Sequence, residues 1–219
     1  MIRLSKCFVS EAEKNIVAKV FSEEHFGMGS YVDAFEKKLK IFFGREVVTV
    51  INGTSALILG LQALGVKRGD EVLVQSMTYL SSFQAISALG AKPIPCDINE
   101  DFTISLEDAQ KKISKKTKAI MPVHYAGDPG ELDKIYKFAK KNNLRVIEDA
   151  AHAFGSSYKE KLLGSIGDVV CFSFDGIKNI TCGEGGCIVT SDKEVIKNIK
   201  DSRLLGIEKD SEKRIQGKR

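Results

Sequence analysis

The stretch VVCFSFDGIKNITCGEGGCIVTS, residues 169–191, contains two apolar segments that are joined by a polar, glycine-rich loop. Each segment is a near-continuous apolar run, which is typical of strands that are covered on both faces. The loop leaves no room for the helical crossover that joins parallel strands. The sequence therefore predicts two buried strands, with the second running antiparallel to the first.

Five further segments upstream have the composition of strands and alternate with helical patterns. Together with residues 168–174 and 187–191, the strand candidates are residues 47–51, 71–76, 92–98, 119–123 and 145–149. The helical patterns between the early strands cover residues 54–64, 81–89, 105–113 and 130–141. Strand and helix repeated in this order predict a layered α/β domain with a mostly parallel sheet of seven strands.

The two ends of the chain differ from this central pattern. Residues 1–45 predict an N-terminal helical arm, with an amphipathic stretch at residues 11–24 and a second helix at residues 31–43. We expect residues 46–206 to form the large domain. Residues 207–219 are highly charged, so we interpret them as the start of a truncated C-terminal region rather than as an arm that binds nucleic acid.

The composition of the 219 residues excludes several classes of protein. Hydrophobic residues make up 43%, which excludes global disorder, and the four prolines exclude a collagen-like chain. The net charge of +4 is too small an excess to indicate nucleic-acid binding. The chain has no apolar run that could span a bilayer and no secretory signal, so we expect a cytoplasmic protein without a membrane partner.

The cysteine and histidine pattern argues against a metal site. The five cysteines, at positions 7, 96, 171, 182 and 187, include no pair in C-x-x-C spacing, and the chain has three histidines. Zinc sites need clustered cysteine and histidine ligands. We therefore expect no metal, and reduced, mostly structural thiols of the kind found in cytosolic proteins.

A first candidate site lies where NGTS, residues 52–55, joins the first strand to an apolar helix. The hydroxyls of Thr54 and Ser55 and the free backbone N–H groups of a helix N-terminus favour a phosphate. The alternative is a helix that is capped by Thr54 or Ser55 and binds no ligand. Such caps are common, so this motif alone favours the alternative.

A second candidate is VIEDAAHAFG, residues 146–155, in which Glu148 and Asp149 end an apolar strand. Strand ends of this kind carry ligand groups in open α/β sheets, and a buried carboxylate there needs a cation or a donor. His152 faces the same site if a helical turn follows. The alternative, with Asp149 as a helix cap and His152 in the core, is equally supported by these residues alone.

A third candidate follows the strand that ends near Ser173, where Lys178 stands between Ile177 and Ile180. Lysine is seldom buried, and one that is desolvated or near a positive charge becomes a neutral amine that can attack a carbonyl and form a Schiff base. The glycines of residues 183–186 allow a sharp reversal into the last strand. The commoner alternative is a surface lysine beside a glycine turn.

The three candidates together favour pyridoxal 5′-phosphate as a cofactor. This cofactor needs a phosphate cradle, an acid that keeps its pyridine nitrogen protonated, and a lysine that carries it covalently. Tyr79, just past the second strand, supplies an aromatic face that can stack on the cofactor ring. Its alternative is a tyrosine at the boundary of the core.

On these motifs the sequence resembles the DegT/DnrJ/EryC1/StrS family of sugar aminotransferases, which are pyridoxal-phosphate enzymes of the aspartate-aminotransferase fold (fold type I). The resemblance covers nearly the whole chain, and its most specific parts are EDAAHA and SFDGIKNITCGEGG. Supporting motifs are GSYVDAFEKKLKIFFG, NGTSAL, GDEVLV, ALGAKPIPCDI and PVHYAG. The resemblance implies a three-layer α/β/α large domain.

The resemblance also implies a role for each candidate residue. Lys178 matches the lysine that carries the cofactor and shuttles the proton of the reaction. Asp149 matches the partner of the pyridine nitrogen, and His152 matches a position near the ring hydroxyl. The remaining matches are Thr54, Ser55 and Ser173 as phosphate contacts and Tyr79 as the stacking aromatic.

The activity that the resemblance implies is transfer of an amino group from glutamate to a nucleotide-linked 4-keto-6-deoxy sugar. Such enzymes serve the biosynthesis of lipopolysaccharide and other bacterial surface glycans, and they form homodimers with shared active sites. Family members are usually longer, with a C-terminal domain that closes the site. We therefore expect a fragment, a truncated product or half of a split enzyme, with weak or no turnover by these residues alone.

Two other functions compete with this one. A nicotinamide-dependent oxidoreductase needs G-x-G-x-x-G after the first strand, and NGTSALILG does not supply it. A catalytically impaired fragment, or a non-enzymatic paralogue that binds pyridoxal phosphate, stays open. The presence of Lys178 favours catalysis.

Overall fold

Seven strands form one mixed sheet at the centre of the computed structural model, which describes residues 7–24 and 26–204. The order across the sheet is β1-β9-β8-β5-β4-β2-β3. The strands are β1 Glu46–Val50, β2 Glu71–Gln75, β3 Lys92–Cys96, β4 Thr117–Met121, β5 Arg145–Asp149, β8 Val169–Ser173 and β9 Gly186–Thr190. All seven strands predicted from the sequence are therefore confirmed.

The last strand runs against its neighbours, as predicted. β9 pairs antiparallel with β8 on one side and with β1 on the other. The pairs β2 with β3, β2 with β4, β4 with β5, and β5 with β8 are all parallel. Because parallel strands end at the same edge of a sheet, the segments that follow β1, β2, β4, β5 and β8 meet at one edge.

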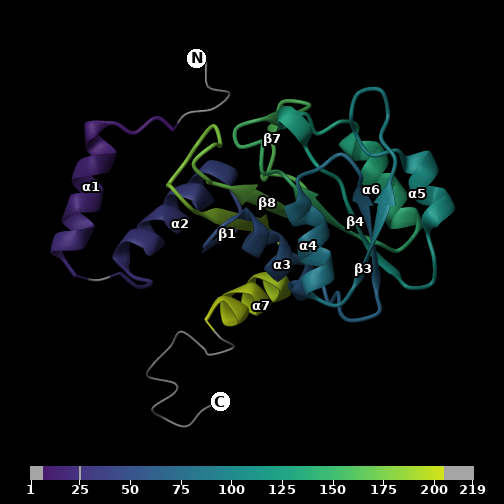
Figure 1. Cartoon of the computed structure of the whole chain (residues 1–219), viewed down its shortest axis with the longest axis horizontal. Coiled ribbons are helices and arrows are strands. Elements are labelled where there is room, and N and C mark those ends of the chain that lie inside the picture. The colour runs from purple at the N-terminus through teal and green to yellow at the C-terminus, as the bar shows by residue number, and fades with distance from the viewer. Residues whose placement is uncertain (1–6, 25, 205–219) are drawn as a thin grey trace, which may run out of the picture.

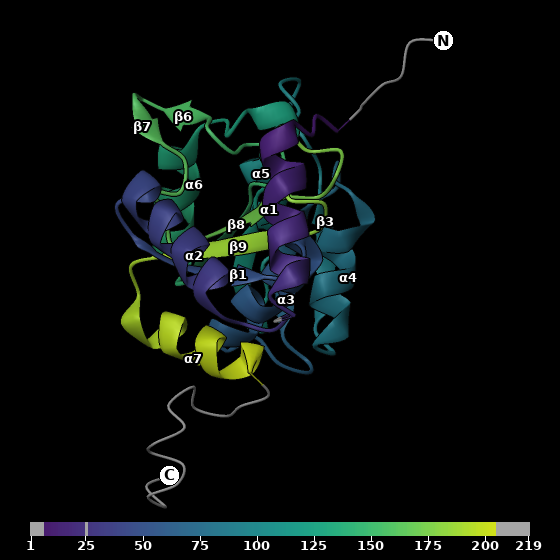
Figure 2. The ribbon, with the colours of Figure 1, turned by 90° about the vertical axis from the view of Figure 1, so that its left-hand side faces the viewer.

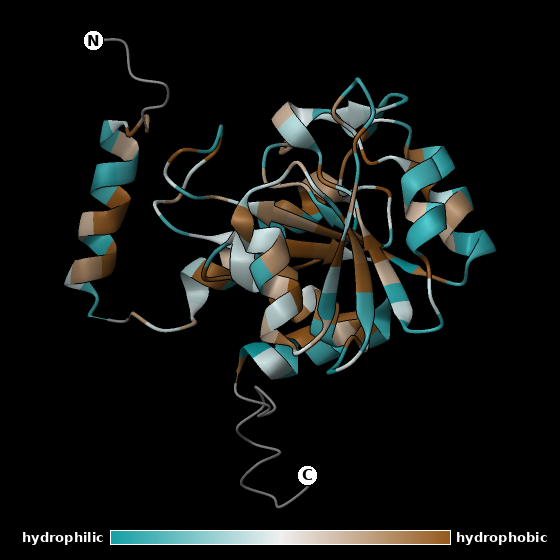
Figure 3. Ribbon diagram, turned by 45° about the vertical axis from the view of Figure 1, so that its right-hand side comes forward, coloured by the Kyte–Doolittle hydropathy of each residue, from teal (hydrophilic) through white to brown (hydrophobic). Residues whose placement is uncertain are grey.

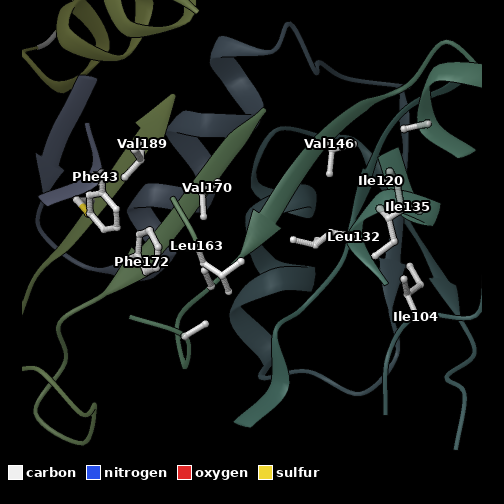
Figure 4. Close-up of a cluster of buried hydrophobic side chains, with 14 of the residues drawn as sticks. Phe43, Ile104, Ile120, Leu132, Ile135, Val146, Leu163, Val170, Phe172 and Val189 are labelled. Atoms are coloured by element: carbon white, nitrogen blue, oxygen red, sulfur yellow. The ribbon is translucent and has the colours of Figure 1, made fainter. Parts of the chain in front are cut away.

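Helices cover both faces of the sheet, and the two faces make separate cores (Figures 1 and 2). One core packs α2, α5 and α6 on the sheet, and part of it is drawn in Figure 4. The other packs α3, α4 and α7. The bounds are α2 Ser30–Phe43, α3 Gly53–Ala63, α4 Leu80–Ala88, α5 Leu106–Lys112, α6 Leu132–Lys141 and α7 Lys193–Arg203. The predicted three-layer α/β/α arrangement is confirmed.

Side chains alternate between the two cores along each strand. On β5, Val146 belongs to the core under α6, and Ile147 belongs to the core under α3. On β8, Val170 belongs to the first of these cores and Val169 belongs to the second. Both faces of β8 are apolar because both are covered, which explains its unbroken apolar run in the sequence. Figure 3 shows the hydrophobic strands surrounded by more hydrophilic helices.

Helix α1, Glu11–Ser22, lies at the edge of the molecule, outside these layers (Figure 1). It has a capping box at Ser10 and no buried residue. Helix α2 differs, because its Leu39 and Phe43 are buried against the sheet. The division of the chain into residues 1–45 and 46–206 stays a prediction, and residues 207–219 lie outside the described residues.

Four elements of the described chain were not anticipated. Helix α7 presents only three buried residues, Val195, Ile196 and Ile199, and so has a weak apolar pattern. Strands β6 Ser157–Tyr158 and β7 Lys161–Leu162 form a short hairpin. Its turn places Lys159 and Glu160 at positive φ without the glycine or asparagine that marks most such turns. A short 3-10 helix, η1 Tyr125–Gly127, follows β4.

Candidate functional site

A cavity of about 740 Å³ lies at the edge of the sheet where the parallel strands end. Six of the seven residues predicted for the site line it, namely Thr54, Tyr79, Asp149, His152, Ser173 and Lys178. Ser55 does not line it. The lining also includes residues that the sequence did not single out, among them Thr78, Tyr125 and Asp175.

The N-terminus of α3 forms one wall of the cavity, and Asn52 caps it. Asn52 Oδ1 accepts a hydrogen bond of 2.8 Å from the backbone N–H of Ser55. The backbone N–H of Ala56 donates to the Asn52 carbonyl at 3.1 Å. The alternative in which Thr54 or Ser55 caps the helix is therefore wrong. The N–H groups of Gly53 and Thr54 have no partner within the described part of the chain, and they are available to an anion.

Two glycines bring this helix end onto the end of β8. A Cβ on Gly53 would lie 2.8 Å from Ser173 Cβ, and a Cβ on Gly186 would lie 2.7 Å from the carbonyl carbon of Asn52. Real side chains essentially never approach that closely. Glycine at both positions is what lets the Ser173 hydroxyl and the free N–H groups of α3 lie on the same wall.

Asp149 ends β5 at the cavity floor with 4% of its surface exposed. Ser82 Oγ donates to its Oδ2 at 2.7 Å, and the backbone N–H of Ala151 donates to its Oδ1 at 3.2 Å. Thr78 Oγ1 lies 2.7 Å from Ser82 Oγ. The prediction that a buried carboxylate here meets a donor is confirmed. Thr78 and Ser82 were missed, although both lie within three residues of Tyr79 in the sequence.

Glu148, the neighbour of Asp149, does not line the cavity. Its carboxylate is fully buried and lies 2.7 Å from His124 Nε2 and 2.5 Å from the Tyr136 hydroxyl. Burial and the nearby carboxylate raise the pKa of Tyr136 well above its ordinary value, so its hydroxyl stays protonated and donates. Successive side chains on a strand point to opposite faces, which separates these two carboxylates.

His152 lines the cavity from the turn that follows Asp149. The residue is exposed, so the alternative that places it in the core is wrong. Its ring meets the Tyr125 ring edge-on, with 5.8 Å between the ring centroids. Partial burial, together with the positive charge of Lys178, lowers the pKa of His152, and Asp149 partly opposes this effect. The imidazole is therefore mainly neutral at pH 7.

Lys178 enters the cavity from the loop between β8 and β9. It is half-buried, and its backbone N–H donates to the Asp175 carbonyl at 3.0 Å. Within the described residues its ammonium group makes no hydrogen bond or salt bridge. Ile177 is 68% exposed and Ile180 is 49% exposed, so the partial burial of the lysine does not come from these two side chains.

Tyr79 stands at the mouth of the cavity at the start of α4, with 77% of its surface exposed. Its ring can cover a planar ligand that enters from solvent. Whether it stacks on a cofactor stays a prediction.

The groups around the cavity have complementary chemistry. Free N–H groups at the α3 N-terminus suit an anion, the Asp149 carboxylate suits a protonated heteroatom, and the Lys178 amine suits a carbonyl carbon. Within residues 7–24 and 26–204, no three His, Cys, Asp or Glu side chains are grouped so that they could hold a metal ion. None of the helices in those ranges is long and apolar enough to cross a membrane.

Comparison with known proteins agrees with this arrangement. The sequence model of the DegT/DnrJ/EryC1/StrS aminotransferase family matches residues 8–219. A curated relative, the GDP-perosamine synthase of Escherichia coli O157:H7, is 50% identical over 167 residues, which are 75% of this chain and 46% of the relative. The chain spans about half the length of the curated relatives it matches.

Solved structures resemble the chain over most of its length. The protein AtS13 from Actinomadura melliaura superposes with a TM-score of 0.92 and 36% identity, over 99% of this chain and 60% of its own. NtdA from Bacillus subtilis, solved with bound cofactor PMP, superposes with a TM-score of 0.81 and 30% identity, over 91% of this chain and 48% of its own. The predicted fold, that of the large domain of pyridoxal-phosphate aminotransferases, is confirmed.

Proposed function

Because this chain belongs to the DegT/DnrJ/EryC1/StrS aminotransferase family, we propose that it is the cofactor-binding part of a pyridoxal-phosphate-dependent aminotransferase. The proposed reaction transfers an amino group from glutamate to a nucleotide-linked 4-keto-6-deoxy sugar. One observation carries the proposal: Lys178 and Asp149 line the same cavity as the N-terminus of α3.

The side chains present fit pyridoxal phosphate. The free N–H groups of Gly53 and Thr54, with the Ser173 hydroxyl beside them, supply the donors that a phosphate requires. Asp149 suits the pyridine nitrogen, because Ser82 holds it as an ordered buried carboxylate. Lys178 supplies a primary amine without a competing ion pair among the described residues. Ser55 is left out of the proposed phosphate contacts, since it does not line the cavity.

Pyridoxal phosphate, when bound, supplies an electron sink for negative charge on the carbon that gains or loses the amino group. Asp149 would keep the proton on the pyridine nitrogen, which strengthens that sink. Lys178 Nζ would hold the cofactor at rest and move the proton of the reacting carbon during turnover. His152, mainly neutral at pH 7, can donate or accept a hydrogen bond at the cavity wall.

The substrate class rests on the relatives. The Escherichia coli relative is named for GDP-perosamine synthesis, which supports a nucleotide-linked sugar as the amino acceptor and a place in bacterial surface glycan biosynthesis, such as that of lipopolysaccharide. We place the reaction in the cytoplasm as part of the proposal. All five cysteines are free thiols, which suits a reducing compartment.

A homodimer is also part of the proposal. Ile177 and Tyr79, which line the cavity, are largely exposed, as are Ile51 and Leu80 beside the lining residues. Apolar side chains gathered around a cavity mouth favour a protein surface that covers them, and a second copy of the chain is the simplest source of one. Sedimentation of the complete gene product tests this point.

The proposed function is tested by trapping and by turnover. The cofactor is added to the protein, reduced with borohydride, and located by peptide mass mapping; we expect the label on Lys178 and no label in Lys178→Ala. A correctly folded preparation with the label elsewhere, or with none, overturns the proposal. The complete gene product is then assayed with glutamate and a panel of nucleotide 4-keto sugars. A label on Lys178 without any turnover identifies the non-enzymatic or impaired alternative.

A further inference from the structure

The loop that carries Lys178, here called the lysine loop (residues 174–185), is closed at its base by its own hydrogen bonds. The backbone N–H of Phe174 donates to the Gly185 carbonyl at 2.8 Å. The Phe174 carbonyl accepts from the Cys182 N–H at 3.1 Å and from the Thr181 hydroxyl at 3.2 Å. These bonds shape the loop, but they do not set where its tip lies relative to the cavity.

Apolar packing does not hold the tip either, because Ile177 and Ile180 are both largely exposed. Two hydrogen bonds join the tip to distant segments of the described chain. The Cys7 thiol donates to the Gly176 carbonyl at 2.6 Å, from the N-terminal segment outside the cavity. The Asn179 side-chain amide donates to the Phe154 carbonyl at 2.9 Å.

Phe154, whose carbonyl accepts that second bond, is held in place by aromatic packing. Its ring stacks on Phe42 with 5.1 Å between centroids and meets the rings of Phe43, Phe172 and Phe174 edge-on. An aromatic cluster of this kind contributes packing energy beyond simple burial. The turn in which Phe154 stands also carries His152 and begins at Asp149. The Asn179 bond thus ties the lysine loop to the segment that bears Asp149 and His152.

We propose that Asn179 is a positioning residue that holds Lys178 in the cavity by linking the lysine loop to the Phe154 carbonyl. Asn179 is the residue next to Lys178, so a bond from its side chain limits how far the lysine backbone can swing away. The part of this inference that concerns the cofactor rests on the proposed function. The part that concerns the loop does not.

The loop is tested first, without cofactor, by amide hydrogen exchange. In Asn179→Ala we expect exchange in residues 175–184 to be about fivefold faster, the size expected for one net hydrogen bond. Exchange in α7 should not change. Asn179→Asp keeps the side-chain size but lacks the amide donor, so it should behave like the alanine variant. If Asn179→Ala does not fold, hydrogen exchange in Asn179→Asp tests the inference by itself.

The matched control is Asn142→Ala. Asn142 also donates from its side-chain amide to a carbonyl at 2.9 Å, that of Phe138, but at the end of α6. Its removal should leave exchange in the lysine loop as in the unaltered chain. The inference is overturned if both Asn179 variants exchange like the unaltered chain, or if Asn142→Ala loosens the lysine loop equally.

The effect of Asn179 on cofactor capture is tested second, by adding pyridoxal phosphate and following its visible absorbance. We expect about fivefold slower covalent capture and a smaller lysine-linked fraction in both Asn179 variants, with the borohydride label still on Lys178. Unchanged capture and an unchanged linked fraction refute the positioning role. If the unaltered chain itself gives no label on Lys178, the proposed function fails, while the exchange experiment still decides whether Asn179 tethers the loop.

Discussion

Ser82 Oγ donates a hydrogen bond of 2.7 Å to Asp149 Oδ2, and both side chains are buried below the mouth of the cavity. Ser82 lies on α4 and Asp149 ends β5, so the bond joins two elements that are distant in sequence. A hydroxyl has one hydrogen, and Ser82 gives its hydrogen to Asp149. The 2.7 Å bond between Ser82 and Thr78 is therefore donated by Thr78.

Replacement of Ser82 by alanine should weaken both the fold and the cofactor site. The buried Asp149 carboxylate loses a donor, which costs about 1–3 kcal/mol of the free energy of unfolding. We expect pyridoxal phosphate to bind more weakly as well, because the carboxylate loses its orientation. Urea unfolding and an absorbance titration measure the two effects. Ser87→Ala, an exposed position on the same helix, is the control and should change neither quantity.

Replacement of Gly53 by alanine should separate the α3 N-terminus from Ser173. The new Cβ would lie 2.8 Å from Ser173 Cβ, so the helix end or the strand end must shift. We expect a loss of about 1–3 kcal/mol in the free energy of unfolding and weaker binding of pyridoxal phosphate. Gly27→Ala is the matched control, since a Cβ there meets nothing within 4 Å. Equal stability of the two variants would contradict the close approach.

Stability should depend on pH through His152. Its pKa is lowered from 6.5 in the folded chain, so the unfolded chain binds the proton more readily. The free energy of unfolding therefore rises as pH increases between the folded and the unfolded pKa, and it falls as pH drops below about 6.5. His152→Gln should reduce this dependence. NMR titration of the imidazole, with urea unfolding from about pH 5 to about pH 8, checks both points. A pKa of 6.5 or above for His152 would contradict the prediction.

Replacement of Tyr136 by phenylalanine should lower stability without altering the cavity. The Tyr136 hydroxyl donates to buried Glu148 and accepts from the Asp168 N–H at 2.7 Å. Its loss leaves a buried carboxylate and an N–H short of a partner, which costs about 1–3 kcal/mol. Cofactor affinity should be unchanged, because Glu148 does not line the cavity. Tyr158→Phe is the comparison, since its hydroxyl accepts a long bond of 3.4 Å from the exposed Asp133 N–H. A marked loss of cofactor affinity in Tyr136→Phe would contradict the prediction, because it would show that the Glu148 side of β5 affects the cavity.

The strands, the layers and most of the site were predictable from the sequence. Apolar runs such as residues 169–174 mark covered strands because hydropathy acts locally, and the short connection before β9 forces an antiparallel strand. The amine of Lys178, the carboxylate of Asp149 and the phosphate donors of the NGTS segment could likewise be predicted, because they follow from residue type. The β6–β7 hairpin was missed because Lys159 and Glu160 adopt positive φ without the residues that favour it.

The sequence by itself determined the order of the elements and the three segments that meet at the cavity, because hydropathy period and side-chain chemistry belong to neighbouring residues. Only the tertiary structure decided that Glu148 points away from the cavity to His124 and Tyr136, that Asn52 caps α3, and that Ser82 holds the Asp149 carboxylate. Those outcomes depend on which face each strand residue presents and on how closely distant elements pack. No local pattern in the sequence specifies either the orientation of these side chains or the packing of these elements.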